Sequence, residues 1–264
     1  MKCYKFWVRE TKKIYIGDVQ QPITVLAGSN VSKEDASSNA GQISRSIEER
    51  IRKPKQGREE YEASIKEHIA KEIDSKNIIT ITRYGAQVLN TTEYTILDID
   101  NYTIFLFMEW FRKKSTLKDK IIDKFKRHIV RHPELGTSFR IYETHQGIRI
   151  IGKHYFDPQE KNFRSIMRSL GVDPLYAFLC RKQNCYRVRL TPKPYRMKME
   201  TIRIKSPLDC ETEAYDTWQK KYTEISRNYS VVKLRETMGA DFGSDPVITH
   251  HDTITNMQAH YPLV

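Results

Sequence analysis

The chain has 264 residues, of which 39% are hydrophobic and 30% are charged, a balance typical of a globular protein with a substantial core. Its longest apolar run falls well short of the roughly 18 residues that cross a bilayer, and its first residues lack the apolar stretch of a signal peptide. The formal net charge of +12 favours association with polyanions. We therefore expect a soluble, cytoplasmic protein whose basic surface meets phosphates.

The cysteines point to the same compartment. Cys180 and Cys185 are separated by four residues, and Cys3 and Cys210 lie far from them. This spacing does not match a structural zinc site. We expect reduced and partly buried thiols.

The first quarter of the chain predicts strands followed by helices. Alternating apolar residues predict three strands, at 5–9, 13–16 and 22–26. Ser32, with Asp35 three residues later, predicts a helix N-terminus, and the helix should run to about Arg52. On it, one apolar stripe is expected at Ile43, Ile47 and Ile51. A second helix is expected from about Arg58 to Ile73, with Ile65, Ile69 and Ile73 on one face.

The remainder of the chain mixes strands and helices. Strands are predicted at 78–82, 86–90, 94–100, 186–190 and 201–205, and a hairpin at 139–144 and 148–151 turning at 145–147. Helices are predicted at 116–131, 158–170 and 211–227. The helix at 116–131 should turn an apolar face inward, formed by Leu117, Ile121, Ile122, Phe125 and Ile129. From Gly239 onward we expect a polar tail.

This order indicates an α+β fold with a mixed or antiparallel sheet and helices packed on it, because strict βαβ alternation is missing. We expect three segments. Residues 1–75 should form N-terminal strands and two helices, residues 76–205 the core, and residues 206–264 a C-terminal helix with the polar tail.

Two carboxylates form the first candidate site. Asp98 and Asp100 are two residues apart on a predicted strand, so their side chains point to the same side of the sheet. Close like charges in an apolar stretch need neutralisation, and Mg²⁺ or Mn²⁺ would supply it. The alternative is a strand end whose carboxylates cap a helix or face water.

The predicted hairpin turn is the second candidate. Gly147 would let backbone N–H groups approach a phosphate, and His145 could bind a phosphate or shuttle a proton. Arg149 could reach the same face. The alternative is an ordinary hairpin with exposed polar residues.

The basic strand and loop at 186–196 are the third candidate. Arg187 and Arg189 share one strand face, while Lys193 and Arg196 follow on a stretch stiffened by prolines. With two interleaved tyrosines, these cations would form a surface for phosphates and bases. The alternative is a solvated basic strand.

Two weaker signals remain. Asp173 follows Gly171 at a predicted helix exit, where it is either a third acidic ligand or part of a turn. His250, His251 and Asp252 in the tail could bind a metal, although the sequence favours a polar tail without a chemical role.

Taken in order, these motifs resemble the catalytic core of the archaeo-eukaryotic primase superfamily, which includes primase-polymerases. The Asp98–Asp100 strand resembles the family's first motif, and Thr144-His145-Gln146-Gly147 falls where the second belongs. Val172-Asp173 resembles the third, and the strand from Arg187 to Pro192 resembles the basic strand that follows. The family's histidine usually follows the glycine, at a position nearer to Arg149 here.

The resemblance implies a primase-like, RRM-like core and a nucleotidyltransferase. Asp98, Asp100 and Asp173 would hold Mg²⁺ or Mn²⁺, and His145 or Arg149 would contact a nucleoside triphosphate. The remaining cations, Arg187, Arg189, Lys193 and Arg196, would grip triphosphate or nucleic acid. The chain also resembles a group of uncharacterised bacterial proteins that share the strings Tyr-Gly-x-x-Val-Leu-Asn-Thr and Leu-Thr-Pro-Lys-Pro.

Two other classes of function stay open from the sequence. One is a non-catalytic nucleic-acid-binding protein with a degenerate primase-like fold, whose affinity depends on salt but not on Asp98. The other is an interaction protein whose basic surface meets an acidic partner.

Overall fold

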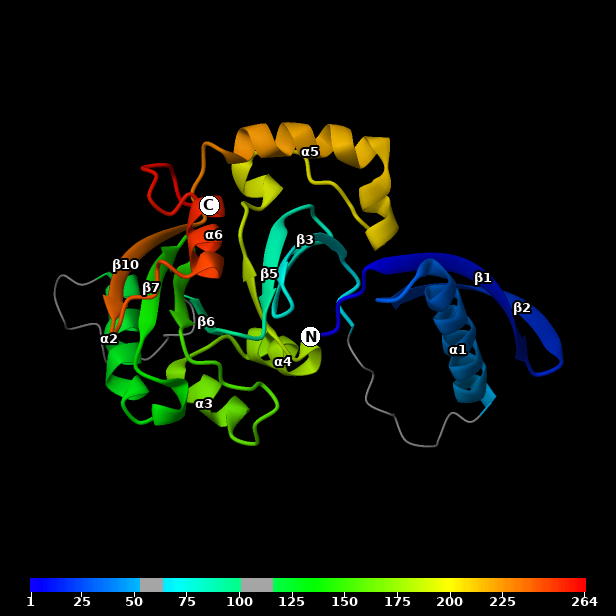
Figure 1. The fold of residues 1–264 in the computed structure, drawn as a ribbon, viewed down its shortest axis with the longest axis horizontal. Coiled ribbons are helices and arrows are strands. Elements are labelled where there is room, and N and C mark those ends of the chain that lie inside the picture. The colour runs from blue at the N-terminus through cyan, green and yellow to red at the C-terminus, as the bar shows by residue number, and fades with distance from the viewer. Residues whose placement is uncertain (53–63, 101–115) are drawn as a thin grey trace.

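The computed structural model describes residues 1–52, 64–100 and 116–264, and within them the chain is an α+β protein with three antiparallel sheets (Figure 1). The strands are β1 (Phe6–Ile16), β2 (Val19–Ser29), β3 (His68–Asp74), β4 (Asn77–Ile81), β5 (Gln87–Thr91), β6 (Thr95–Asp100), β7 (Phe139–Thr144), β8 (Gly147–Gly152), β9 (Tyr186–Arg189) and β10 (Val232–Met238). The helices are α1 (Lys33–Arg52), α2 (Leu117–Ile129), α3 (Phe163–Leu170), α4 (Pro174–Gln183), α5 (Glu213–Ser226) and α6 (Pro246–Ile254), with short 3₁₀ turns η2 (Pro133–Leu135), η3 (Pro194–Met197) and η4 (Pro207–Glu211). The predicted fold class is confirmed at this level.

The N-terminal hairpin and α1 lie at one side of the molecule (Figure 1). Two of the predicted strands merge into β1, which pairs with β2 along its whole length across a turn at Gly17. The predicted N-cap of α1 is confirmed, because the Asp35 N–H donates to Ser32 Oγ at 3.1 Å. The apolar stripe is wrong: Ile43 and Ile51 are exposed, and the helix buries small residues instead, namely Ala36, Ala40 and Ser44.

The second sheet has the order β3-β4-β5-β9. The prediction of a second helix at about 58–73 is wrong in its second half. Residues 68–74 form the strand β3, which pairs with β4. Isoleucines four residues apart fit one helix face, but Ile65 and Ile69 instead pack with Cys3 and Cys185 beside this sheet. The start of the predicted helix, at 58–63, lies outside the described residues.

The third sheet has the order β10-β7-β8-β6, and its two faces differ. One face is apolar and packs under α2 and α3, with the rings of Phe125 and Phe139 edge to face at 5.3 Å. Of the predicted inward residues of α2, only Leu117 is exposed. The other face carries Tyr142, against which His251 of α6 packs with ring centroids 5.1 Å apart.

The last third of the chain differs most from expectation. The predicted strand at 201–205 is not a strand, and the supposed polar tail contains α6 and follows β10, which pairs with β7. The apolar core includes Val232, Val247 and Ile248, so this tail is part of the packed fold. Among the described helices, none combines the length and apolar character needed to cross a bilayer.

Candidate phosphate-binding cleft

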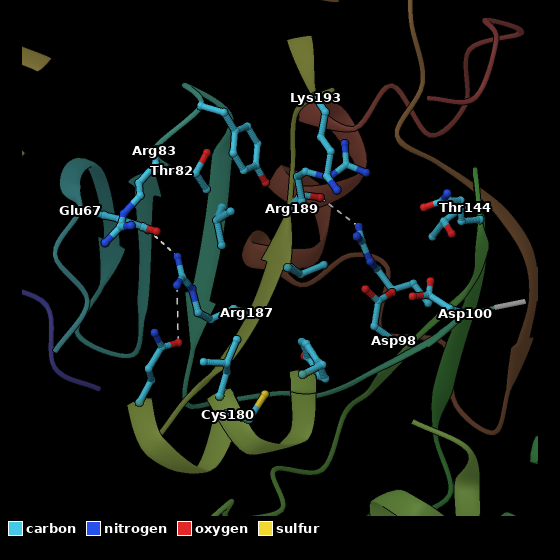
Figure 2. Close-up of a pocket in the computed structure, with 18 of the residues that line it drawn as sticks. Glu67, Thr82, Arg83, Asp98, Asp100, Thr144, Cys180, Arg187, Arg189 and Lys193 are labelled. Carbon is cyan, nitrogen blue, oxygen red and sulfur yellow. Dashed lines mark hydrogen bonds and ion pairs between the residues drawn. The ribbon is translucent and has the colours of Figure 1, made fainter. Parts of the chain in front are cut away.

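A cleft of about 520 Å³ lies where the second and third sheets meet, and it gathers most of the predicted site residues (Figure 2). Three hydrogen bonds join its walls. The Asp173 N–H donates to the Asp98 carbonyl at 3.2 Å, the Tyr176 hydroxyl to the Ile96 carbonyl at 3.2 Å, and Arg149 Nη1 to the Arg189 carbonyl at 3.0 Å. β6 is thereby held beside α4, and β8 beside β9.

Register places the acidic and basic groups of the third sheet side by side. Asp98 on β6 lies opposite Arg149 on β8, and Arg149 lies opposite Tyr142 on β7. Directly opposed residues on one sheet face are close enough for their side chains to interact. Asp100 follows Asp98 on the same face and also lines the cleft, as predicted from their spacing.

The Asp98 carboxyl is half-buried in the cleft. Desolvation raises its pKa above the ordinary value, the Arg149 guanidinium opposes this rise, and the nearby Asp100 adds to it. Desolvation likewise lowers the pKa of Arg149, and Asp98 opposes that shift. Each group is therefore the main compensating charge for the other, and the buried Arg149 Nε has no hydrogen-bond partner among the described residues.

The basic strand and the following loop line the opposite wall. Arg189 donates to the Thr191 carbonyl, but desolvation and then repulsion from Arg149 lower its pKa to about 10. Arg196 reaches Gln146 at 2.6 Å, and the Lys193 ammonium lies 5.9 Å from the centre of the Tyr195 ring. No described carboxylate is within ion-pair distance of Arg189, Lys193 or Arg196, so this wall presents uncompensated positive charge.

Arg187 has a different environment from the other cations. Its guanidinium forms an ion pair with Glu67 and also contacts Gln183 at 3.5 Å (Figure 2). Desolvation lowers its pKa, but Glu67 outweighs this and the pKa is raised. Arg187 thus lines the cleft as a neutralised pair, which the strand pattern did not anticipate.

Two predicted residues do not point into the cleft. The Asp173 carboxylate accepts the Tyr176 N–H at 2.6 Å and caps α4, although its backbone touches β6. His145 is exposed, and its Nδ1 lies 3.0 Å from the Leu263 carbonyl. The structure therefore gathers two of the three predicted acids, together with Arg149 in place of the histidine.

Gly147 has a packing role rather than the predicted phosphate contact. Its N–H already donates to Thr144 Oγ1 at 3.0 Å. A Cβ at this position would lie 2.1 Å from the Ile99 carbonyl oxygen, so only glycine lets β8 approach β6 this closely.

The tail histidine forms a buried structural cluster. His251 Nδ1 lies 2.8 Å from the Asp252 carboxylate, and Arg140 joins Asp252 to Asp241. Arg140 Nε also donates to the Tyr142 hydroxyl at 2.8 Å. His251 and Asp252 are therefore engaged within the fold.

The acidic residues of the cleft meet only part of the requirement for a bound divalent metal ion. No group of three or more His, Cys, Asp or Glu side chains among the described residues is arranged to hold a metal ion. Mg²⁺ often takes one or two carboxylates and completes its shell with water and substrate phosphates. Asp98 and Asp100 satisfy that smaller requirement, whereas the predicted three-acid set does not assemble.

Several cleft residues were not singled out from the sequence. They are Glu67, Arg83, Tyr84 and Tyr176, whereas Thr144 and Gln146 belong to the predicted second motif. Tyr84 belongs to the string Tyr-Gly-x-x-Val-Leu-Asn-Thr, and Arg83 precedes it. Glu67 and Tyr176 come from segments that carried no motif.

Comparison with protein families, with curated proteins and with solved structures finds no match.

Proposed function

We propose that the cleft binds the phosphates of a nucleotide or a nucleic-acid strand and carries out metal-dependent nucleotidyl transfer. The observation that carries the proposal is the meeting of Asp98 and Asp100 with Arg189, Lys193 and Arg196 in one cleft. The lining holds six Lys and Arg side chains against three carboxylates, and one acid and one base cancel as the Glu67–Arg187 pair. The surplus of positive charge attracts a polyanion.

The cationic wall supplies the phosphate contacts. With a pKa of about 10, Arg189 stays charged at neutral pH, and partial desolvation strengthens its attraction for an anion. The guanidinium groups of Arg189 and Arg196 can each donate two parallel hydrogen bonds to a phosphate. Lys193 sits between two prolines, so little entropy is lost when its backbone is fixed.

A stacking surface stands at the end of this wall. Tyr195 is 60% exposed and follows Lys193, whereas Tyr186, the other tyrosine of the segment, is fully buried. Desolvation raises the pKa of Tyr195, but Lys193 and Arg196 outweigh it and the pKa is lowered. An exposed ring in such positive surroundings suits a base whose phosphate lies beside it.

The acidic end supplies the groups for the reaction. A divalent ion held there would polarise phosphoryl oxygens and lower the pKa of a hydroxyl. Asp98 and Asp100 would position it, and Arg149 would oppose the rise in the pKa of Asp98 that desolvation causes. Arg189 and Lys193 would neutralise charge developing on a pyrophosphate leaving group. The resemblance to the primase superfamily supports this assignment.

Incorporation of labelled nucleotide tests the proposal directly. The protein is incubated with Mn²⁺, a single-stranded template and labelled nucleoside triphosphates. Incorporation should fall to background in Asp98→Asn and in Asp100→Asn, and should persist in Asp123→Asn, which removes an exposed carboxylate on α2. Absence of incorporation in the unaltered protein, or equal incorporation in all variants, would refute nucleotidyl transfer.

A second function is favoured by the position of Asp173. Because this carboxylate is used to cap α4, the site lacks the third acid of the primase pattern. A non-catalytic nucleic-acid-binding protein needs only the cationic wall. It should bind single strands with an affinity that falls steeply with salt and falls again in Arg189→Ala. Asp98→Asn should then leave binding intact, and an affinity that ignores salt would exclude this function.

A further inference from the structure

An exposed apolar stripe on α4 begins outside the cleft and ends at its edge. Leu175, Phe178 and Leu179 are spaced like one face of a helix, yet they are 65%, 41% and 39% exposed, and of the three Leu179 also lines the cleft. α4 packs into the core through Ala177 and Cys180 instead. Contiguous exposed apolar side chains commonly mark an interaction site.

A groove of about 610 Å³ runs between α3 and α4 next to this stripe. Met167, Val172 and Ala177 are buried and give it an apolar floor, and the Phe178 ring forms one wall. The groove and the cleft share no lining residue, although Leu179 of the cleft follows Phe178 of the groove on α4. Occupation of the groove and occupation of the cleft are therefore separable.

The rim of the groove is cationic. The Arg164 guanidinium and the Lys182 ammonium each lie 6.0 Å from the centre of the Phe178 ring. Arg164 and Arg168, one helical turn apart on α3, have no carboxylate of the described residues within ion-pair distance. An apolar floor between unpaired guanidinium groups complements a ligand that carries both apolar groups and carboxylates.

We propose that this groove binds an acidic amphipathic segment of a partner protein. One or two apolar side chains of the segment enter between α3 and α4, and its carboxylates pair with Arg164 and Arg168. A concave pocket of this size favours inserted side chains over the flat surface of a bilayer. The floor residues Met167, Val172 and Ala177 are not aromatic, so they suit inserted apolar side chains better than stacked bases. The proposal does not depend on the proposed function of the cleft.

Fluorescence anisotropy with designed peptides tests the groove. The probe is a short labelled helical peptide with Leu and Phe on one face and Glu elsewhere. One control peptide replaces Glu with Lys, and another replaces Leu and Phe with Ala. Phe178→Ala and Arg164→Glu test the groove, while Leu117→Ala, equally exposed at 41%, and Arg45→Glu on α1 are matched control variants.

The acidic apolar peptide should bind, and neither control peptide should. Phe178→Ala and Arg164→Glu should each weaken binding about tenfold or more, as hot-spot residues do, and the matched variants should not. No binding of the acidic apolar peptide, or equal binding by all variants, overturns the proposal. Anionic vesicles and a single-stranded oligonucleotide are tested as well. If one of them binds in a way that depends on Phe178, and the peptide does not bind, the groove binds that ligand and the proposal of an acidic peptide is overturned.

Discussion

Replacing Arg149 with methionine should destabilise the protein strongly and in a pH-dependent way. The side chain is 3% exposed, and its charge is the main one opposing desolvation of Asp98. Removing one partner of a buried pair leaves the other charge uncompensated, which costs about 3–5 kcal/mol. Loss of the hydrogen bond to the Arg189 carbonyl adds about 1 kcal/mol. Methionine has no buried N–H to leave unpaired, and the removal of the unpaired Arg149 Nε partly offsets that loss.

The sign of the pH effect follows from Asp98. Its pKa is already raised in the folded state, so its contribution to stability is fully present below the unfolded pKa and is lost as pH rises through the folded pKa. In Arg149→Met the folded pKa rises further, and the loss extends to higher pH. The variant should therefore be more strongly destabilised at about pH 8 than at about pH 5.

Urea unfolding of four proteins measures this effect. Unaltered protein, Arg149→Met, Asp98→Asn and the double variant complete a thermodynamic cycle at each pH. The double variant should recover part of the stability lost in Arg149→Met, and its stability should vary with pH no more than that of Asp98→Asn. Equal destabilisation at both pH values, with no recovery in the double variant, would show that Asp98 and Arg149 are not coupled.

Three further substitutions probe the cleft surroundings. Gly147→Ala should lower the free energy of unfolding, measured by thermal unfolding, by about 3 kcal/mol, because its Cβ would lie 2.1 Å from the Ile99 carbonyl oxygen. An unchanged stability would contradict the close approach of β8 to β6. Asp173→Ala should cost about 1 kcal/mol in urea unfolding through loss of the α4 cap; unchanged stability would show that the cap contributes nothing. Arg187→Met should lower the free energy of unfolding by about 3 kcal/mol, because it leaves the Glu67 carboxylate without its ion-pair partner. The salt dependence of nucleic-acid binding should stay the same, and a smaller salt slope would show that Arg187 contacts phosphate.

Local patterns predicted the parts of the fold that local chemistry decides. The hairpin at 139–151 and the strand ending at Asp100 lie where alternation and turn residues placed them. Because side chains two apart share a sheet face, the common orientation of Asp98 and Asp100 followed from spacing alone. The convergence of Arg189 with them did not, since it depends on how β9 approaches β8.

The failures arise where tertiary packing overrides periodicity. Ile65, Ile69 and Ile73 repeat every four residues, but β4 offers an edge that residues 68–74 pair with. Likewise Ile43 and Ile51 fit a helical stripe, yet the hairpin accepts only small side chains against α1. His145 was placed by motif position, which says nothing of the Leu263 carbonyl that it meets.

Charge compensation separates the cations that hold the fold together from those available to a ligand. Arg140 is buried between Asp241 and Asp252, and Arg187 is paired with Glu67. Arg189 is half-buried, as Arg187 is, yet its strongest charged neighbour is another cation, Arg149. An uncompensated, desolvated cation destabilises a fold unless an anion joins it. A phosphate bound at Arg189 would remove that penalty, so ligand binding there should raise the melting temperature, and Arg187 would contribute little to it.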